Sequence, residues 1–129
     1  MTAARQTGKA ARLRPARTPL DRLREICLAL PEAAEQETWG SPTFRVADRI
    51  FVKYATGDGR ASFWCKAPAG SQAVLVGADP ALFFVPPYVG PKGWIGMRLD
   101  VPLDWQEVAT VVRRSYRLVA PKRLALSLD

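Results

Sequence analysis

Residues 43–67, TFRVADRIFVKYATGDGRASFWCKA, restrict the possible folds of this chain more than any other stretch. They contain three runs rich in Phe, Val, Ile, Tyr and Trp, which are interrupted only by AD and by GDG. β-Branched and aromatic residues favour strands, and short interruptions with Asp and Gly favour tight turns. Strands joined by tight turns run antiparallel. The stretch therefore predicts three consecutive antiparallel strands.

The remaining elements follow from apolar periodicity and from helix boundary signals. Thr18 precedes Pro19 and an apolar pattern with helical spacing, which is typical of an N-cap followed by proline at the first helical position. An acidic segment, residues 32–42, is predicted to connect this helix to the first strand. We predict helices over residues 18–30, 71–78 and 103–121, and two further strands over residues 82–86 and 93–100.

This order of elements predicts an α+β fold with two layers. Three helices are sufficient to cover one face of a five-stranded sheet but not both faces. We therefore expect an open antiparallel five-stranded sheet that carries all three helices on one face. At 129 residues the chain has the length of one domain with a short tail. We expect a single domain over residues 18–129, preceded by a basic, flexible tail over residues 1–17.

The positive charge of the chain is concentrated in that tail. The formal net charge is +7, and residues 1–19 contain five cations and no acid, so the rest of the chain is nearly neutral. The five cations are Arg5, Lys9, Arg12, Arg14 and Arg17. The total charge therefore says little about the function of the folded part.

Alternation along the predicted strands separates the residues of the two sheet faces. The face towards the helices is predicted to contain Phe44, Val46, Ile50, Val52, Tyr54, Phe63, Cys65, Ile95, Met97 and Leu99. The open face is predicted to contain Arg45, Arg49, Phe51, Lys53, Ser62, Trp64, Lys66, Trp94, Gly96 and Arg98. Cations and aromatic rings without a carboxylate suit DNA, a single-stranded nucleic acid or another anionic ligand, whose charges pair with cations and whose bases or rings stack on the aromatic side chains.

The candidate nucleic-acid-binding residues on this open face are Arg45, Lys53, Trp64, Lys66, Trp94 and Arg98. Two other interpretations remain open. Exposed aromatic rings with cations at the rim also characterise a protein interface, such as that of a homodimer. A register slip of one residue would exchange the two faces. The chain is expected to be a monomer or a homodimer.

Residues 82–96, LFFVPPYVGPKGWIG, combine aromatic rings with three prolines and three glycines. Pro86 and Pro87 cannot donate to a sheet ladder, so the chain must leave the sheet there. One interpretation of the segment is a structural corner that seals the core. The other is a pocket for a small planar aromatic ligand, formed by Trp39, Tyr88, Lys92 and Trp94.

Catalysis has little support in the sequence. The chain contains no histidine, so the commonest general base and metal ligand is absent. It also lacks a glycine-rich phosphate loop, and its carboxylates are scattered. We expect a non-catalytic binding protein without a metal or cofactor. Cys27 and Cys65 are predicted to be buried thiols and not a disulfide.

Hydropathy bears on the cellular location. No apolar run approaches the roughly 20 residues of a membrane span, and the first residues lack an apolar signal core. We therefore expect a cytoplasmic protein that does not associate with membranes.

Three segments carry motifs that occur together in one family. Residues 27–54, CLALPEAAEQETWGSPTFRVADRIFVKY, contain a helix ending in Leu-Pro, an acidic link, Trp-Gly-x-Pro-x-Phe and a strand with lysine. Residues 85–100, VPPYVGPKGWIGMRLD, join a proline-rich Tyr segment to a Trp-led strand, and residues 115–124, SYRLVAPKRL, end the last helix. In this order the segments resemble the MmcQ/YjbR family of small bacterial proteins, and the likeness extends over residues 20–124.

The resemblance implies a two-layer α+β fold like that of secretion chaperones and frataxin-like domains, and a DNA-binding function. It assigns the family's characteristic positions to Trp39, Gly40, Pro42, Phe44, Lys53, Lys66, Pro87, Tyr88, Trp94, Ser115 and Tyr116. The chain departs from the family pattern at GPKGW, residues 90–94, where many members have His or Asn. Three functions thus remain open: nucleic-acid binding, binding of a small planar molecule, and protein interaction.

Overall fold

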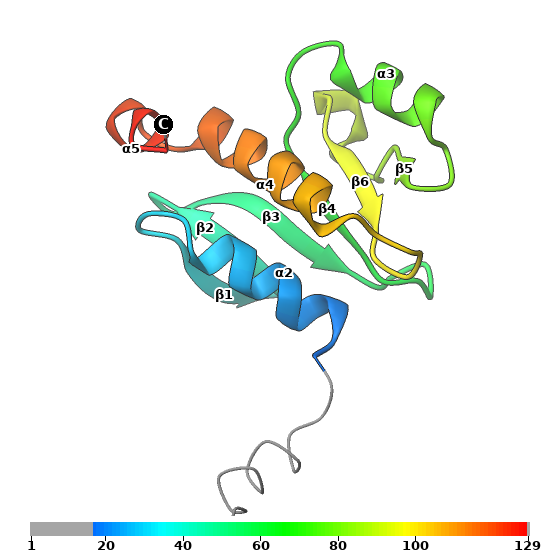
Figure 1. Cartoon of the computed structure of the whole chain (residues 1–129), viewed down its shortest axis with the longest axis horizontal. Helices are drawn as coiled ribbons and strands as arrows, with labels where there is room; N and C mark the ends of the chain where they lie inside the picture. The colour runs from blue at the N-terminus through cyan, green and yellow to red at the C-terminus, as the bar shows by residue number, and fades with distance from the viewer. Residues whose placement is uncertain (1–16, 129) are drawn as a thin grey trace, which may run out of the picture.

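The computed structural model describes residues 17–128, which form a six-stranded antiparallel sheet with helices packed on one side (Figure 1). The strand order is β1-β2-β3-β4-β6-β5. Of the predicted tail, residues 1–16 lie outside the described part, and Arg17 pairs with Glu25. The elements are, in chain order, α2 (Pro19–Leu28), β1 (Ala34–Thr38), β2 (Ser41–Val46), β3 (Arg49–Ala55), β4 (Ser62–Cys65), α3 (Ser71–Ala78), β5 (Phe83–Phe84), η1 (Gly90–Lys92), β6 (Ile95–Arg98), α4 (Trp105–Val119) and α5 (Lys122–Leu126).

The prediction of an α+β fold with an antiparallel sheet is confirmed, but the predicted number of five strands is wrong. The additional strand is β1, which pairs with β2 along its whole length. Its sequence, AEQET, is polar and exposed because the strand lies at the edge of the sheet, so it lacks the alternation of a half-buried strand. Trp39 and Gly40 form the turn, with φ of 51° and 78°. Positive φ at both positions is the type I′ geometry that fits a twisted hairpin.

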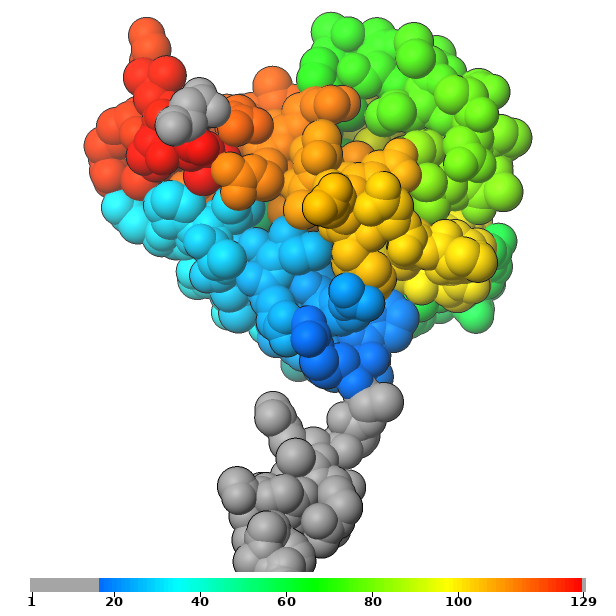
Figure 2. Space-filling model, in the orientation of Figure 1, coloured from blue at the N-terminus to red at the C-terminus, as the bar shows by residue number. Residues whose placement is uncertain are grey.

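The helix layer also differs from the predicted arrangement of three helices. Within the described residues a further short helix, α5, follows Pro121, and α3 contains no buried residue. Figure 1 shows α3 beside β5 and β6 at one end of the sheet, while α2 and α4 lie across the other strands. Figure 2 shows this side of the molecule, where the atoms of α2 and α4 pack closely together. α4 buries Val108, Val111, Val112, Ser115, Tyr116 and Val119.

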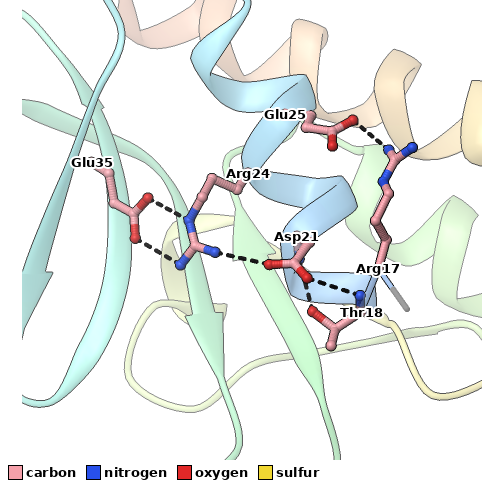
Figure 3. Close-up of polar contacts among 6 residues, drawn as sticks. All are labelled: Arg17, Thr18, Asp21, Arg24, Glu25 and Glu35. Carbon is pink, nitrogen blue, oxygen red and sulfur yellow. Dashed lines mark hydrogen bonds and ion pairs between the residues drawn. The ribbon is translucent and has the colours of Figure 1, made fainter. Parts of the chain in front are cut away.

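Polar contacts hold α2 at its start and against β1 (Figure 3). Thr18 is the predicted N-cap, and it forms a capping box with Asp21 through two hydrogen bonds of 3.0 Å. Arg24 links the helix to β1, because its guanidinium donates to both carboxylate oxygens of Glu35 at 2.6 and 3.0 Å. The Glu35 side chain therefore lies on the helix side, and the other side of β1 is left uncovered by helices.

A β-bulge in β3 changes the predicted distribution of residues between the two faces. Phe44 pairs with Val52 and Arg45 pairs with Ile50, so Phe51 has no partner in β2. The extra residue shifts the alternation by one position, so Ile50 and Val52 no longer share a face. Phe51 is fully buried beneath α4, whereas Ile50 lines a hollow on the open face.

The face predictions for Arg49, Ile50 and Phe51 are therefore wrong. Arg49 pairs with Val46, a core residue, and shares the helix side with it. Beyond the bulge the predicted alternation is confirmed. The residues in register on the open face are Lys53, Trp64 and Gly96, and those in register on the helix side are Tyr54, Phe63 and Met97.

Ser115 joins α4 to the bulge. Its hydroxyl donates to the Phe51 carbonyl at 2.7 Å and accepts a hydrogen bond from the Lys66 amide at 2.9 Å. The ring of Phe51 meets that of Tyr116 edge-on, with 5.3 Å between the ring centroids. The Tyr116 hydroxyl donates to the Pro31 carbonyl at 2.6 Å. These contacts hold the bulge in place and so determine which residues of β3 reach the open face.

Tyr116→Phe is expected to lower the free energy of unfolding by about 0.5–1.5 kcal/mol, because it removes one hydrogen bond and leaves the ring in place. Urea denaturation measures this difference. Tyr54→Phe is the matched control, since Tyr54 packs against the core and its hydroxyl has no hydrogen bond with the described residues. Equal effects of the two substitutions would show that the contact with Pro31 adds no stability.

Cys27 and Cys65 are free and buried, in a helix and a strand as predicted. Burial raises the pKa of the Cys65 thiol to about 12, so this thiol stays protonated at neutral pH. No helix in residues 17–128 is long and apolar enough to cross a membrane.

Candidate ligand-binding cleft

A cleft of about 480 Å³ lies on the open face of the sheet, on the side that the helices leave uncovered. Three parts of the chain surround it: the β1–β2 hairpin, the paired strands β3 and β4, and the loop from β5 to β6. Its size falls within the range of small-molecule pockets in proteins. The lining residues are Thr38, Trp39, Ile50, Lys53, Trp64, Tyr88, Val89 and Trp94.

The inner wall of the cleft is formed by residues of the sheet. Trp64 lies in β4 and Trp94 immediately precedes β6, and both side chains are half-buried. Ile50 reaches the cleft because of the bulge in β3. Lys53 pairs with Trp64 across β3 and β4, and its ammonium lies 4.8 Å from a ring centroid of that tryptophan, which is a cation–π contact.

Two aromatic side chains at the rim are unusually exposed. Trp39 is 93% exposed and Tyr88 is 88% exposed. Both have left-handed backbones, with φ of 51° and 67°. Such backbones in non-glycine residues cost on the order of 1–3 kcal/mol and concentrate at functional sites. Trp39 has this backbone because it lies in the type I′ turn between β1 and β2. The exposure of the two rings, which adds nothing to the core, is therefore the strongest indication of a binding site.

Prolines and glycines shape the loop that presents Tyr88. Pro86 and Pro87 follow β5, and the chain returns to β6 through the short 3₁₀ helix η1. Gly93 ends η1 with φ of 86°, a left-handed backbone that glycine adopts without strain. The chain therefore leaves the sheet after β5, as the prolines predict, and this turn forms one side of the cleft.

Gln72 of α3 holds this loop against the rest of the protein. Its side-chain amide donates to the carbonyls of Gly90 at 2.9 Å and of Trp94 at 2.6 Å. A side chain at position 90 has no room, since a Cβ there would lie 2.6 Å from Val85 Cγ1. The loop that carries Tyr88 and Trp94 is thus braced at both ends of η1.

A second hollow of about 290 Å³ adjoins the cleft and shares Trp64 and Tyr88 with it. Arg98 lies beside this hollow, where it donates to the Asp58 carboxylate at 2.7 Å and lies 4.0 Å from the ring centroid of Phe84. The hydrogen bond from Arg98 holds the pKa of the Asp58 carboxyl below its usual range. The Arg98 guanidinium is therefore already paired with a carboxylate and an aromatic ring of the protein itself.

The structure brings together half of the candidate nucleic-acid-binding residues. Lys53, Trp64 and Trp94 meet in the cleft. Arg98 lies beside the second hollow, and Arg45 lies behind the rim, where it donates to the Thr38 hydroxyl at 2.9 Å. Lys66 is exposed just after β4 and lines neither hollow.

Three of the four candidate pocket residues, Trp39, Tyr88 and Trp94, line the cleft. The fourth, Lys92, is exposed in η1 and does not line the cleft. The cation of the cleft is Lys53 instead. Sequence reasoning did not include Thr38 and Ile50 in the site because it predicted neither β1 nor the bulge. Their positions depend on strand pairing, for which the local sequence carried no signal.

Comparisons with known proteins identify the fold and the family. The structure is similar to the crystal structure of Deinococcus radiodurans protein DR2400, described by the family domain DUF419, with a TM-score of 0.70 over 89% of this chain and 90% of that chain. The two sequences are 22% identical, so this likeness shows the fold alone. No curated protein matches the chain in sequence. The YjbR family model matches residues 28–118, which confirms the resemblance noted in the sequence: the chain belongs to the YjbR family.

Proposed function

We propose that this protein is a non-catalytic binding protein that takes up a planar aromatic small molecule in the cleft. The observation that carries the proposal is the pair of exposed rings, Trp39 and Tyr88, at the rim of an apolar cleft with two more tryptophans in its wall. Apolar clefts with a few polar groups are the usual sites for small ligands. Each aromatic pair formed with the ligand contributes about 0.5–1.5 kcal/mol beyond the burial of apolar area.

The cleft is separate from the hydrophobic core, which lies on the helix side of the sheet. None of the four aromatic residues that line the cleft belongs to the cluster of buried core residues in the described chain. Substitutions at the rim therefore change the binding surface without removing core contacts. This separation allows binding and stability to be measured independently in the same variant.

Tryptophan fluorescence provides a direct test. The chain has four tryptophans, of which three line the cleft and the fourth, Trp105, lies in α4 against Arg22. In a Trp105→Phe protein all tryptophan emission comes from the cleft. Neutral bicyclic and tricyclic aromatic compounds are expected to quench this emission. When the free concentration of such a compound is one hundred times its dissociation constant, binding should raise the free energy of unfolding by about 2.7 kcal/mol.

Trp39→Ala and Tyr88→Ala are each expected to weaken binding of a quenching compound by roughly 2- to 10-fold, because each removes one stacking surface. The dissociation constant is measured by fluorescence titration in the Trp105→Phe background. Val74→Ala is the matched control, since Val74 is also a largely exposed apolar residue but lies in α3, outside the cleft. An aromatic panel that changes neither the emission nor the melting temperature would contradict the proposal.

A single-stranded nucleic acid is the second candidate ligand. The exposure of Trp39 and Tyr88 favours it, because unpaired bases stack on such rings. It ranks second because Arg45 and Arg98 already donate to acceptors within the protein, which leaves fewer cations for phosphates. Salt separates the two candidates: for single strands the logarithm of the affinity falls by about 0.7 per phosphate neutralised for each unit of log salt, whereas binding of a neutral ring changes little.

A further inference from the structure

Lys53 is the one charged residue among those that line the cleft. It lies in the middle of β3 and is half-buried, with its ammonium over the ring of Trp64. Among residues 17–128 no carboxylate or other acceptor forms an ion pair or hydrogen bond with it. Burial lowers the pKa of Lys53, and no neighbouring carboxylate offsets this effect within the described chain. The cation of the cleft thus lacks a counter-ion.

The other two cations on this part of the sheet have acceptors in the protein. Arg98 pairs with the Asp58 carboxylate at 2.7 Å, and Arg45 donates to the Thr38 hydroxyl at 2.9 Å. Burying a charge is unfavourable unless it is paired, so half-buried cations are normally provided with acceptors. Lys53, unlike Arg45 and Arg98, has no acceptor within the described chain. An acceptor atom of a bound ligand would supply the missing partner of its ammonium.

The charges around the cleft also favour a ligand with a negative charge. Arg45 lies directly behind Thr38, a lining residue, and its ion-pair partner Asp48 is 3.9 Å away with a side chain that is 91% exposed. Asp58 lines the adjoining hollow and is occupied by Arg98. The cleft therefore has an excess of positive charge in apolar surroundings, where charges interact more strongly than in water.

We propose that the ligand of this cleft is an aromatic anion, a planar ring bearing a carboxylate or sulfonate, and that Lys53 selects it by pairing with the anionic group. This inference rests on the function proposed above and defines its ligand class. The ammonium has three donors, so it can keep its contact with Trp64 while it donates to an oxygen of the ligand. The aromatic walls and rim hold the ring, and the lysine distinguishes the anion from neutral compounds of the same shape.

The test compares 2-naphthoate with 2-naphthamide, which have the same ring system but differ in charge. Dissociation constants are measured by isothermal titration calorimetry with the full-length protein at pH 7.5 and low salt. We expect the naphthoate to bind at least tenfold more tightly than the naphthamide. This preference should decrease as salt is added, because ions screen the pairing of the two charges.

Variants of Lys53 assign the preference to this side chain. Lys53→Met keeps an unbranched apolar chain over Trp64, and it is expected to abolish the preference while the naphthamide affinity changes by less than about threefold. Lys53→Arg should retain most of the preference, and a retained melting temperature verifies that each variant is folded. Lys122→Met, which removes an exposed cation from α5, is the control for net charge and should behave as the unaltered protein.

The possible outcomes separate this inference from the proposed function. Equal affinity of the unaltered protein for the two compounds would overturn the inference and leave the proposed function intact. A preference that persists in Lys53→Met would also overturn it, because the selection would then arise elsewhere. If neither compound binds and no compound of the neutral aromatic panel binds either, both the inference and the proposed function are wrong.

Discussion

Replacing Phe51 with Ala is expected to lower the free energy of unfolding by about 3–5 kcal/mol, the usual cost of truncating a fully buried phenylalanine. Phe51 is 0% exposed and meets Tyr116 of α4 edge-on. Its own carbonyl accepts the hydrogen bond from Ser115, so the side chain and the backbone of this residue hold the same helix. The loss should appear in urea denaturation as a lower midpoint.

Ile50→Ala is the matched control for this substitution. Ile50 is the neighbour of Phe51 but lies half-buried on the open face, so its truncation should cost only about 1 kcal/mol. Simple alternation without the bulge would place Ile50 in the core and Phe51 outside, and it predicts the reverse order of the two effects. A larger loss from Ile50→Ala than from Phe51→Ala would therefore contradict the bulge.

Trp64→Ala is expected to weaken binding of an aromatic ligand by about 10- to 100-fold, which corresponds to about 1.4–2.8 kcal/mol. Trp64 lines both the cleft and the adjoining hollow, and its ring supports the ammonium of Lys53. The substitution removes a binding wall and also releases the cation from its position. Trp105→Phe, a change of the same residue type outside the cleft, should leave the dissociation constant unchanged.

The same variant distinguishes a small ligand from a nucleic acid. Residues 1–16 contain Arg5, Lys9, Arg12 and Arg14, which can attract an oligonucleotide without any contribution from the cleft. Trp64→Ala keeps all of these cations. Weakened binding of single-stranded DNA at constant salt would implicate the cleft in nucleic-acid binding, whereas an unchanged affinity would assign that binding to the basic residues. Loss of aromatic binding alone supports the small-molecule proposal.

The turn formed by the prolines and glycines of residues 82–96 also positions one of the exposed aromatic rings. Local residue chemistry already indicates that residues 82–96 turn away from the sheet, since proline cannot donate to a ladder. In the structure the turn places Tyr88 at a rim that it shares with Trp39 of the distant β1–β2 hairpin. The segment therefore forms a turn out of the sheet and also one side of the cleft.

Local sequence is sufficient to predict the features that depend on near neighbours in the chain. The capping box at Thr18, the turn at Ala47 and Asp48 with φ of 51° and 64°, and the positions of α3 and α4 each follow from a few adjacent residues. The family motifs are local in the same sense, and residues 28–118 match the YjbR family model. Such features are predictable because their energetics involve only residues that are close in sequence.

Only the tertiary structure determines where the open face departs from simple alternation and which of its residues line the cleft. β1 is a strand because its backbone groups pair with β2, an interaction that does not require apolar side chains. The bulge places Phe51 beneath α4 and turns Ile50 outward, and it depends on contacts with a helix that follows much later in the chain. Alternation already predicts Lys53 on the open face, but that Lys53 and not Lys92 lines the cleft depends on how the β1–β2 hairpin and the β5–β6 loop lie around it. Pairing and packing between distant segments set these positions, and the patterns within any one segment do not contain that information.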